Sequence, residues 1–258
     1  MKNSFENKKI EDVRVESAEN VNKKYEKHLE NGFRPIMACV GTPDQFKVST
    51  PKEEYFDEGE KDYEINYYEK HERLVFDDFK NPEESSYVIS PVDQYNKYSV
   101  NFANCTGVIG IGYDKNLGKN ISFMSHEDPD YFLKKRKNTN LLLKDLGETL
   151  SELRDRSENG SIDAIIFGGN FFHKKDSIED YKEYQKNYIE SIKLLAREIE
   201  DILGFEPIVI IGPKTTYGLD NVYFDNKNRR LFISRPEVGD ATTESFLPSE
   251  LEEHIKKL

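Results

Sequence analysis

The sequence predicts an α/β (α+β) fold in which helices pack against a mixed β-sheet. Short apolar runs rich in Val, Ile and Phe are bounded by Gly, Asn and Asp, as strands are. Two longer segments carry Leu and Ile at helical spacing. These patterns follow the order hairpin, helix, strand, helix, strand, hairpin, which favours a mixed sheet with helices against it. The 258 residues suffice for one large domain, or one domain with an extension.

The chain changes character near residue 86. Residues 1–85 form a charged N-terminal extension, whose first part, 1–31, predicts a solvated helix or a partly disordered arm. The compact apolar run at 33–41 predicts a short buried strand. Residues 44–85 are dense in Glu, Asp, Lys and Tyr, which indicates a solvated segment draped on the body and a candidate partner surface. Residues 86–258 form the main domain.

The main domain begins with a predicted antiparallel hairpin. Its strands are 106–113 and 121–126, joined by a turn cluster at 114–120. The remaining predicted elements alternate between helical and strand patterns, and Gly204 ends the second long helix. In chain order they are a helix at 135–156, a strand at 161–169, a helix at 177–203, a strand at 206–212, two strands around the turn at 225–228, and a short helix at 249–258.

The charge balance excludes several classes of partner. With 37 Lys and Arg against 49 Asp and Glu, the net charge is −12, which argues against a general nucleic-acid binder and against adsorption to an anionic membrane. No stretch approaches the ~20 apolar residues of a membrane span, and the N-terminal residues lack a signal-peptide core. With only Cys39 and Cys105, a reducing compartment is the simplest reading, although one disulfide stays formally open. We therefore expect a cytoplasmic protein, with export as an effector left open.

Two cofactor hypotheses fail on spacing. The run GVIGIGYDKNLGKN resembles a phosphate loop, but Gly112 and Gly118 are separated by five residues rather than four, and Asn120 follows the Lys where a hydroxyl residue belongs. His126 stands beside a group of acids that could hold a hard cation, but the ligand spacing of a catalytic metal site is missing. The sequence predicts neither a metal nor another cofactor.

The hairpin brings a thiol and an imidazole together. A turn centred between Lys115 and Asn116 places Cys105 opposite His126, and directly opposed residues have Cβ atoms about 4.5–5.5 Å apart. A register shifted by two residues still leaves the pair on one face, about 7–8 Å apart. A Cys–His pair is the minimum for nucleophilic catalysis by a thiol, and we expect a thiolate with a depressed pKa beside an imidazolium.

At these residues the sequence resembles the chemotaxis glutamine deamidase (CheD) family, and the wider fold group that includes the catalytic domain of the cytotoxic necrotizing factors. The resemblance covers about residues 86–236 and lies in four segments in the family's order. These are NCTGVIGIGYD with Cys105 at the nucleophile, SFMSH ending in the catalytic histidine at His126, AIIFGG at 164–169, and YGLDNVYFDNKNRRLFISRP with Gly218, Val222 and Phe224. Residues 1–85 have no counterpart in the family.

The resemblance implies a CheD-like catalytic domain at 86–258, with a mixed β-sheet or β-sandwich core and flanking helices. It also implies that a protein substrate loses the side-chain amide of a glutamine through a thioester intermediate. The family carries a Thr six residues before the nucleophile as a third catalytic member, and Ser99 stands there in this chain. Asn104 and Thr106 flank the nucleophile and are expected to shape the pocket and the oxyanion site.

Two other functions remain open at this point. The first is a catalytically silent binding module on the same fold, with residues 44–85 as its partner surface. The second is another thiol enzyme, such as a protease or a transglutaminase-like transferase.

Overall fold

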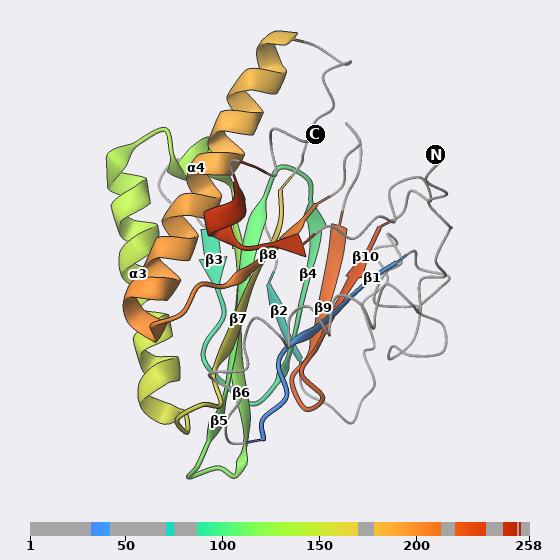
Figure 1. The fold of residues 1–258 in the computed structure, drawn as a ribbon, viewed down its shortest axis with the longest axis vertical. Coiled ribbons are helices and arrows are strands. Elements are labelled where there is room, and N and C mark those ends of the chain that lie inside the picture. The colour runs from blue at the N-terminus through green and yellow to red at the C-terminus, as the bar shows by residue number, and fades with distance from the viewer. Residues whose placement is uncertain are drawn as a thin grey trace, which may run out of the picture.

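The computed structural model describes residues 32–41, 71–74, 87–169, 178–212, 220–235, 245–251 and 253. These residues form three layers: two mixed β-sheets packed face to face, and helices on the outer face of the larger sheet (Figure 1). The coarse prediction of an α/β fold with helices against a mixed sheet is therefore confirmed. The predicted arm at 1–31 and most of the candidate partner surface at 44–85 lie outside the described residues.

The smaller sheet has five strands. Parallel pairs lie at its two edges and antiparallel pairs at its centre. In spatial order they are β1 (Met37–Gly41), β10 (Arg230–Ser234), β9 (Asp220–Asp225), β4 (Asn96–Phe102) and β2 (His71–Leu74). Both edge strands come from the predicted N-terminal extension, and each pairs with a strand of the main domain, β1 with β10 and β2 with β4.

The larger sheet has six strands and carries the helices. In spatial order its strands are β11 (Ser245–Phe246), β8 (Ile208–Ile211), β7 (Asp163–Gly168), β5 (Thr106–Asp114), β6 (Lys119–Glu127) and β3 (Tyr87–Ile89). The helices are α2 (Pro129–Phe132), α3 (Arg136–Arg156) and α4 (Ile178–Leu203), and a 3-10 turn, η6, spans Pro248–Glu250. This turn starts one residue before the predicted C-terminal helix, because Pro248 suits a first helical position.

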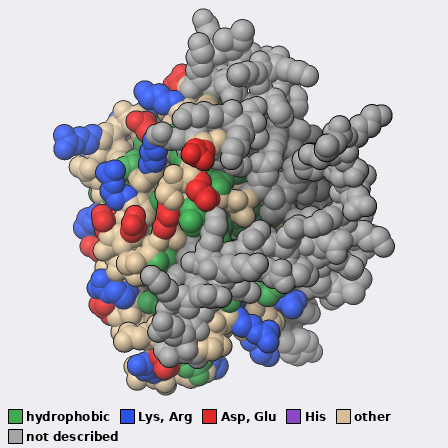
Figure 2. Space-filling model, in the orientation of Figure 1, with side chains coloured by type: hydrophobic (Ala, Val, Ile, Leu, Met, Phe, Trp, Pro, Cys, Tyr) green, Lys and Arg blue, Asp and Glu red, His purple; other side chains and the backbone are tan. Residues whose placement is uncertain are grey.

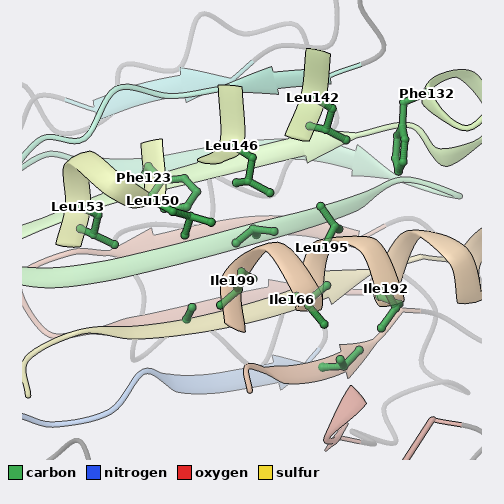
Figure 3. Close-up of a cluster of buried hydrophobic side chains, with 14 of the residues drawn as sticks. Phe123, Phe132, Leu142, Leu146, Leu150, Leu153, Ile166, Ile192, Leu195 and Ile199 are labelled. Carbon is green, nitrogen blue, oxygen red and sulfur yellow. The ribbon is translucent and has the colours of Figure 1, made fainter. Parts of the chain in front are cut away.

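Apolar side chains from the two long helices fill the space above the larger sheet. Every third or fourth residue of α3 is buried, and the same spacing recurs on α4. Figure 3 shows these side chains meeting residues of β6 and β7; those labelled are Phe123, Phe132, Leu142, Leu146, Leu150, Leu153, Ile166, Ile192, Leu195 and Ile199. Burial of this apolar stripe, rather than helix propensity alone, holds the helices on the sheet.

A second core lies between the two sheets. Alternate residues of β5 and β6 point into it, including Ile109 and Met124, while their neighbours Val108 and Phe123 point to the helices. The larger sheet is therefore apolar on both faces, which explains why its strands read as continuous hydrophobic runs.

Polar contacts tie the two sheets together at the end where the hairpins turn (Figure 1). Asn120 Nδ2, just after the β5–β6 turn, donates to Asn226 O in the β9–β10 turn at 3.0 Å. Arg229, which is 4% exposed, donates to Ser161 O at 2.8 Å and to Arg34 O at 3.0 Å. With one end of the sandwich fixed in this way, the start of β5 and the end of β6 lie at the opposite end.

Candidate active site

His126 lies at the interface between the two sheets, near the end of β6. Its imidazole is fully buried, and its Nδ1 is 2.9 Å from Ser99 Oγ on β4. His126 shares the inner face of β6 with Met124, because side chains alternate along a strand. The larger sheet thus supplies the ring and the smaller sheet supplies the hydroxyl, across 27 residues of sequence.

Phe102 covers the imidazole. Its ring stacks on that of His126 with centroids 3.8 Å apart and planes 15° apart, and it meets Phe167 edge-on at 5.1 Å. All three residues are at most 1% exposed. Phe102 was not among the predicted site residues, since nothing in its local sequence distinguishes it from an ordinary core residue.

Cys105 is a free thiol that lies just before β5, on the loop from β4. It is 6% exposed and packs in the same inter-sheet core as Phe102. Its carbonyl accepts a hydrogen bond of 2.7 Å from Gly169 N. Gly168 has φ +80, and a Cβ there would lie 2.7 Å from Cys105 O, so only glycine allows the end of β7 to approach this closely. The Phe-Gly-Gly end of β7 thereby fixes the backbone of Cys105.

The predicted hairpin register is wrong by two residues. The strands pair Thr106 with Glu127 and Ile109 with Met124, which places Gly107 rather than Cys105 opposite His126. The turn is centred between Asn116 and Leu117 rather than between Lys115 and Asn116: Asp114 pairs with Lys119, and Gly118 N donates to Asp114 O across three intervening residues, with Gly118 at φ +62. Cys105 and His126 are therefore diagonal neighbours on the inner face, an arrangement in which Cα atoms lie about 7–8 Å apart.

Burial sets the protonation of both groups. Desolvation raises the pKa of the Cys105 thiol well above its ordinary value, and the charges of Asp128, Glu127 and Asp130 raise it further. Burial lowers the pKa of His126 to about 3. The expected pairing of thiolate with imidazolium is wrong for this structure, in which burial favours a neutral thiol and a neutral imidazole at pH 7.

The two residues that flank the thiol lie in different places. Thr106 directs its hydroxyl to the helical side, where its Oγ1 is 3.0 Å from Ser191 Oγ on α4. Its side chain is therefore on the opposite face of β5 from Cys105 and does not shape a pocket around the thiol, contrary to the prediction. Asn104 is half-buried in the bend between β4 and β5, beside the thiol in sequence.

A buried carboxyl behind the thiol–imidazole face was missed. Glu127 is fully buried, accepts a short hydrogen bond from Ser125 Oγ, and lies opposite Thr106. Burial raises its pKa to about 8, so Glu127 is mostly protonated at pH 7. Its position could have been predicted from strand alternation. His126 and Glu127 are adjacent on a buried strand, so if one side chain faces the other sheet, the next faces the helices.

On the face in Figure 2, acidic and basic side chains are mixed over the described part, and no histidine is seen there, consistent with the burial of His126. No described helix combines the length and apolarity needed to cross a bilayer. Within the described ranges, no three His, Cys, Asp or Glu side chains converge as a metal site requires.

Neither a scan of protein-family models nor a search of curated proteins finds a match to this chain.

Proposed function

We propose that the protein is a cysteine-dependent amidohydrolase that converts glutamine side chains of a protein substrate to glutamate, on a fold similar to that of the CheD family. The observation that carries the proposal is the 2.9 Å contact between Ser99 Oγ and His126 Nδ1, with Cys105 on the same inner face. For Nε2 to accept the thiol proton, Nδ1 must hold the ring hydrogen and donate it to Ser99 Oγ. The hydroxyl then orients the ring, as third members of catalytic triads do.

The first half of the reaction releases ammonia. The thiol proton moves to His126 Nε2 while Cys105 Sγ bonds to the carboxamide carbon, so a neutral pair suffices at the start. Backbone N–H groups of residues 104–105 stabilise the oxyanion, and such donors are each worth about 2.7–4 kcal/mol. Collapse breaks the C–N bond, and the proton on Nε2 passes to the leaving nitrogen.

The second half restores the enzyme. Water gives a proton to His126 Nε2 and adds to the thioester carbon, and the C–S bond then breaks. The proton on the ring returns to sulfur, and the product is a glutamate side chain. Because the described packing leaves Cys105 only 6% exposed, substrate entry requires the residues over the thiol to move.

The test uses the full chain and a panel of glutamine-bearing proteins, together with a blocked glutaminyl dipeptide. Ammonia release is measured enzymatically, and intact mass reports deamidation as a gain of about one dalton per site, the difference between acid and amide. Cys105→Ala and His126→Gln should abolish both signals, whereas Cys39→Ala, which removes the other cysteine of the chain, should retain them. Ammonia release that survives in folded Cys105→Ala would contradict the proposal.

The second candidate is a catalytically silent binding module, and the burial of Cys105 with its raised thiol pKa favours it. It predicts that Cys105→Ala keeps full activity in cells, while charge reversal in residues 52–72 does not. A third thiol chemistry, transfer in place of hydrolysis, is distinguished by adding a primary amine, since a transferase would attach that amine to the substrate.

A further inference from the structure

We propose that Phe102, brought to the inner face of β4 by a bulge at Asn101, is a positioning residue that holds the His126 ring in the orientation the reaction needs. The catalytic purpose of this positioning rests on the proposed function. The contacts between Phe102, His126 and Ser99 are independent of that function. Phe102 touches no reacting atom in the scheme above, and it acts through the ring on which it lies.

The stack restricts the one rotation that would misplace the ring nitrogens. Rotating His126 about its Cβ–Cγ bond exchanges Nδ1 with a carbon and removes the 2.9 Å contact to Ser99 Oγ. Phe102 lies nearly parallel to the ring at 3.8 Å, which is close to van der Waals contact, so the imidazole cannot turn out of its plane without displacing a fully buried phenyl group. Phe167 supports that phenyl group edge-on at 5.1 Å, so the restraint extends into the core.

A bulge is the reason that Phe102 reaches the imidazole. Ser99 and Phe102 are three residues apart, so in a regular strand they would face opposite sides. In β4 they face the same side, because the stretch from Ser99 to Phe102 is paired with only the stretch from Val222 back to Asp220. The extra residue bends the strand and re-aims the side chain that follows, as bulges beside functional sites do.

Asn101 is the residue that makes the bulge. Its φ is 65, a left-handed conformation that Asn and Gly tolerate better than other residues. Its N–H donates to Asn221 Oδ1 at 3.1 Å, and its carbonyl accepts from Ala103 N at 3.0 Å. These bonds fix the bulge from both sides, so one backbone conformation sets both the hydroxyl and the phenyl group against the imidazole.

The direct test is the tautomer of His126, read from ring ¹⁵N chemical shifts in the full chain, with His126→Gln used for assignment. The wild-type ring should show a single fixed tautomer with hydrogen on Nδ1. Phe102→Leu should show shifts averaged between the two tautomers, because a ring that is free to turn loses the contact between Nδ1 and Ser99 Oγ that selects one tautomer. The matched control is Phe224→Leu, which removes the same volume from a fully buried site in the same core, at a position that pairs with Lys97 rather than with Ser99.

The second test uses the bulge. Asn101→Gly keeps the left-handed conformation and should preserve the single tautomer, whereas Asn101→Val disfavours it and should reproduce the averaged shifts of Phe102→Leu. On a substrate turned over by the wild type, Phe102→Leu should lower kcat by about 10- to 100-fold with little change in KM, as misplacement of a catalytic group does.

The outcomes separate this inference from the proposed function. A single Nδ1–H tautomer in folded Phe102→Leu, indistinguishable from Phe224→Leu, overturns the positioning role whether or not the protein is an enzyme. Averaged shifts in Phe102→Leu with no amide hydrolysis by the wild type would support the positioning role and reject the deamidase.

Discussion

Neutralising the buried carboxyl of Glu127 should change how the stability of the protein depends on pH. Glu127→Gln retains the volume of the side chain and an oxygen that accepts from Ser125 Oγ, but it cannot ionise. Burial raises the pKa of Glu127 from the ordinary value of 4.5 to about 8. A carboxyl whose pKa is raised by folding contributes its full stability below the unfolded pKa, and that contribution is lost as pH rises through the folded pKa.

The size of the effect follows from the pKa difference. At about 1.4 kcal/mol for each pKa unit, ionisation of Glu127 in the unfolded chain costs the wild type roughly 1 kcal/mol of unfolding free energy at pH 5.5 and roughly 4 kcal/mol at pH 8. Glu127→Gln removes this cost. The free energies of unfolding of variant and wild type should therefore diverge by about 3 kcal/mol between these two pH values, with the variant more stable at pH 8.

Urea denaturation followed by circular dichroism at several pH values between 5.5 and 8 measures the difference. Acidification also protonates His126 in the unfolded chain, while burial keeps its folded-state pKa at about 3. This cost affects wild type and variant alike and cancels in the comparison. Glu148→Gln is the control, because its carboxyl on α3 is 68% exposed. Parallel pH profiles for wild type and Glu127→Gln would refute the reasoning, since they would mean that folding does not desolvate this carboxyl.

Three further substitutions test other parts of the site and its support. Ser99→Ala should lower kcat about 10- to 100-fold through loss of ring orientation, and Ser99→Thr should restore most of it; equal rates for all three proteins would argue against a triad. Asp128→Asn keeps a good N-cap for α2 but removes a charge that raises the pKa of the Cys105 thiol. Alkylation of Cys105 by iodoacetamide at pH 8 should therefore be several-fold faster than in wild type. The control, Asp155→Asn at an exposed carboxyl, should leave the alkylation rate unchanged. Arg235→Met removes the cation 2.9 Å from buried Asp220 and should lower the free energy of unfolding, measured by urea denaturation, by about 3–5 kcal/mol. Adding Asp220→Leu should recover part of this loss. An equal loss in the single and the double variant would count against a buried ion pair.

Most of the fold could be predicted because its signals are local. The long helices follow from leucine and isoleucine spacing, and the hairpins from turn residues between apolar runs. The register of β5 and β6 could not be obtained in this way. The cluster between the strands offers several positions for a turn, and the choice depends on Asp114, whose Oδ1 accepts from Asn116 N at 2.8 Å and Leu117 N at 3.1 Å.

The candidate site was only partly accessible from the sequence. The shared face of Cys105 and His126 follows from strand alternation, and the same rule would have placed Thr106 on the other face had it been applied to adjacent residues. The position of Ser99 came from the family resemblance, and its catalytic role stays a prediction. The contact of Phe102 with the imidazole could not be predicted, because it depends on the bulge in β4. That bulge depends on pairing with β9, a strand more than a hundred residues away.

Ser99 and His126 belong to different sheets. The hydroxyl of Ser99, the imidazole of His126 and the thiol of Cys105 therefore assemble only when the two sheets pack together. Each layer could keep its strands in a loosened, partly denatured state and still lose the contact that orients the imidazole. Catalytic turnover would then disappear at denaturant concentrations where far-ultraviolet circular dichroism still reports intact strands. Turnover would then report the packing of the two sheets against each other more sensitively than any measurement of secondary structure.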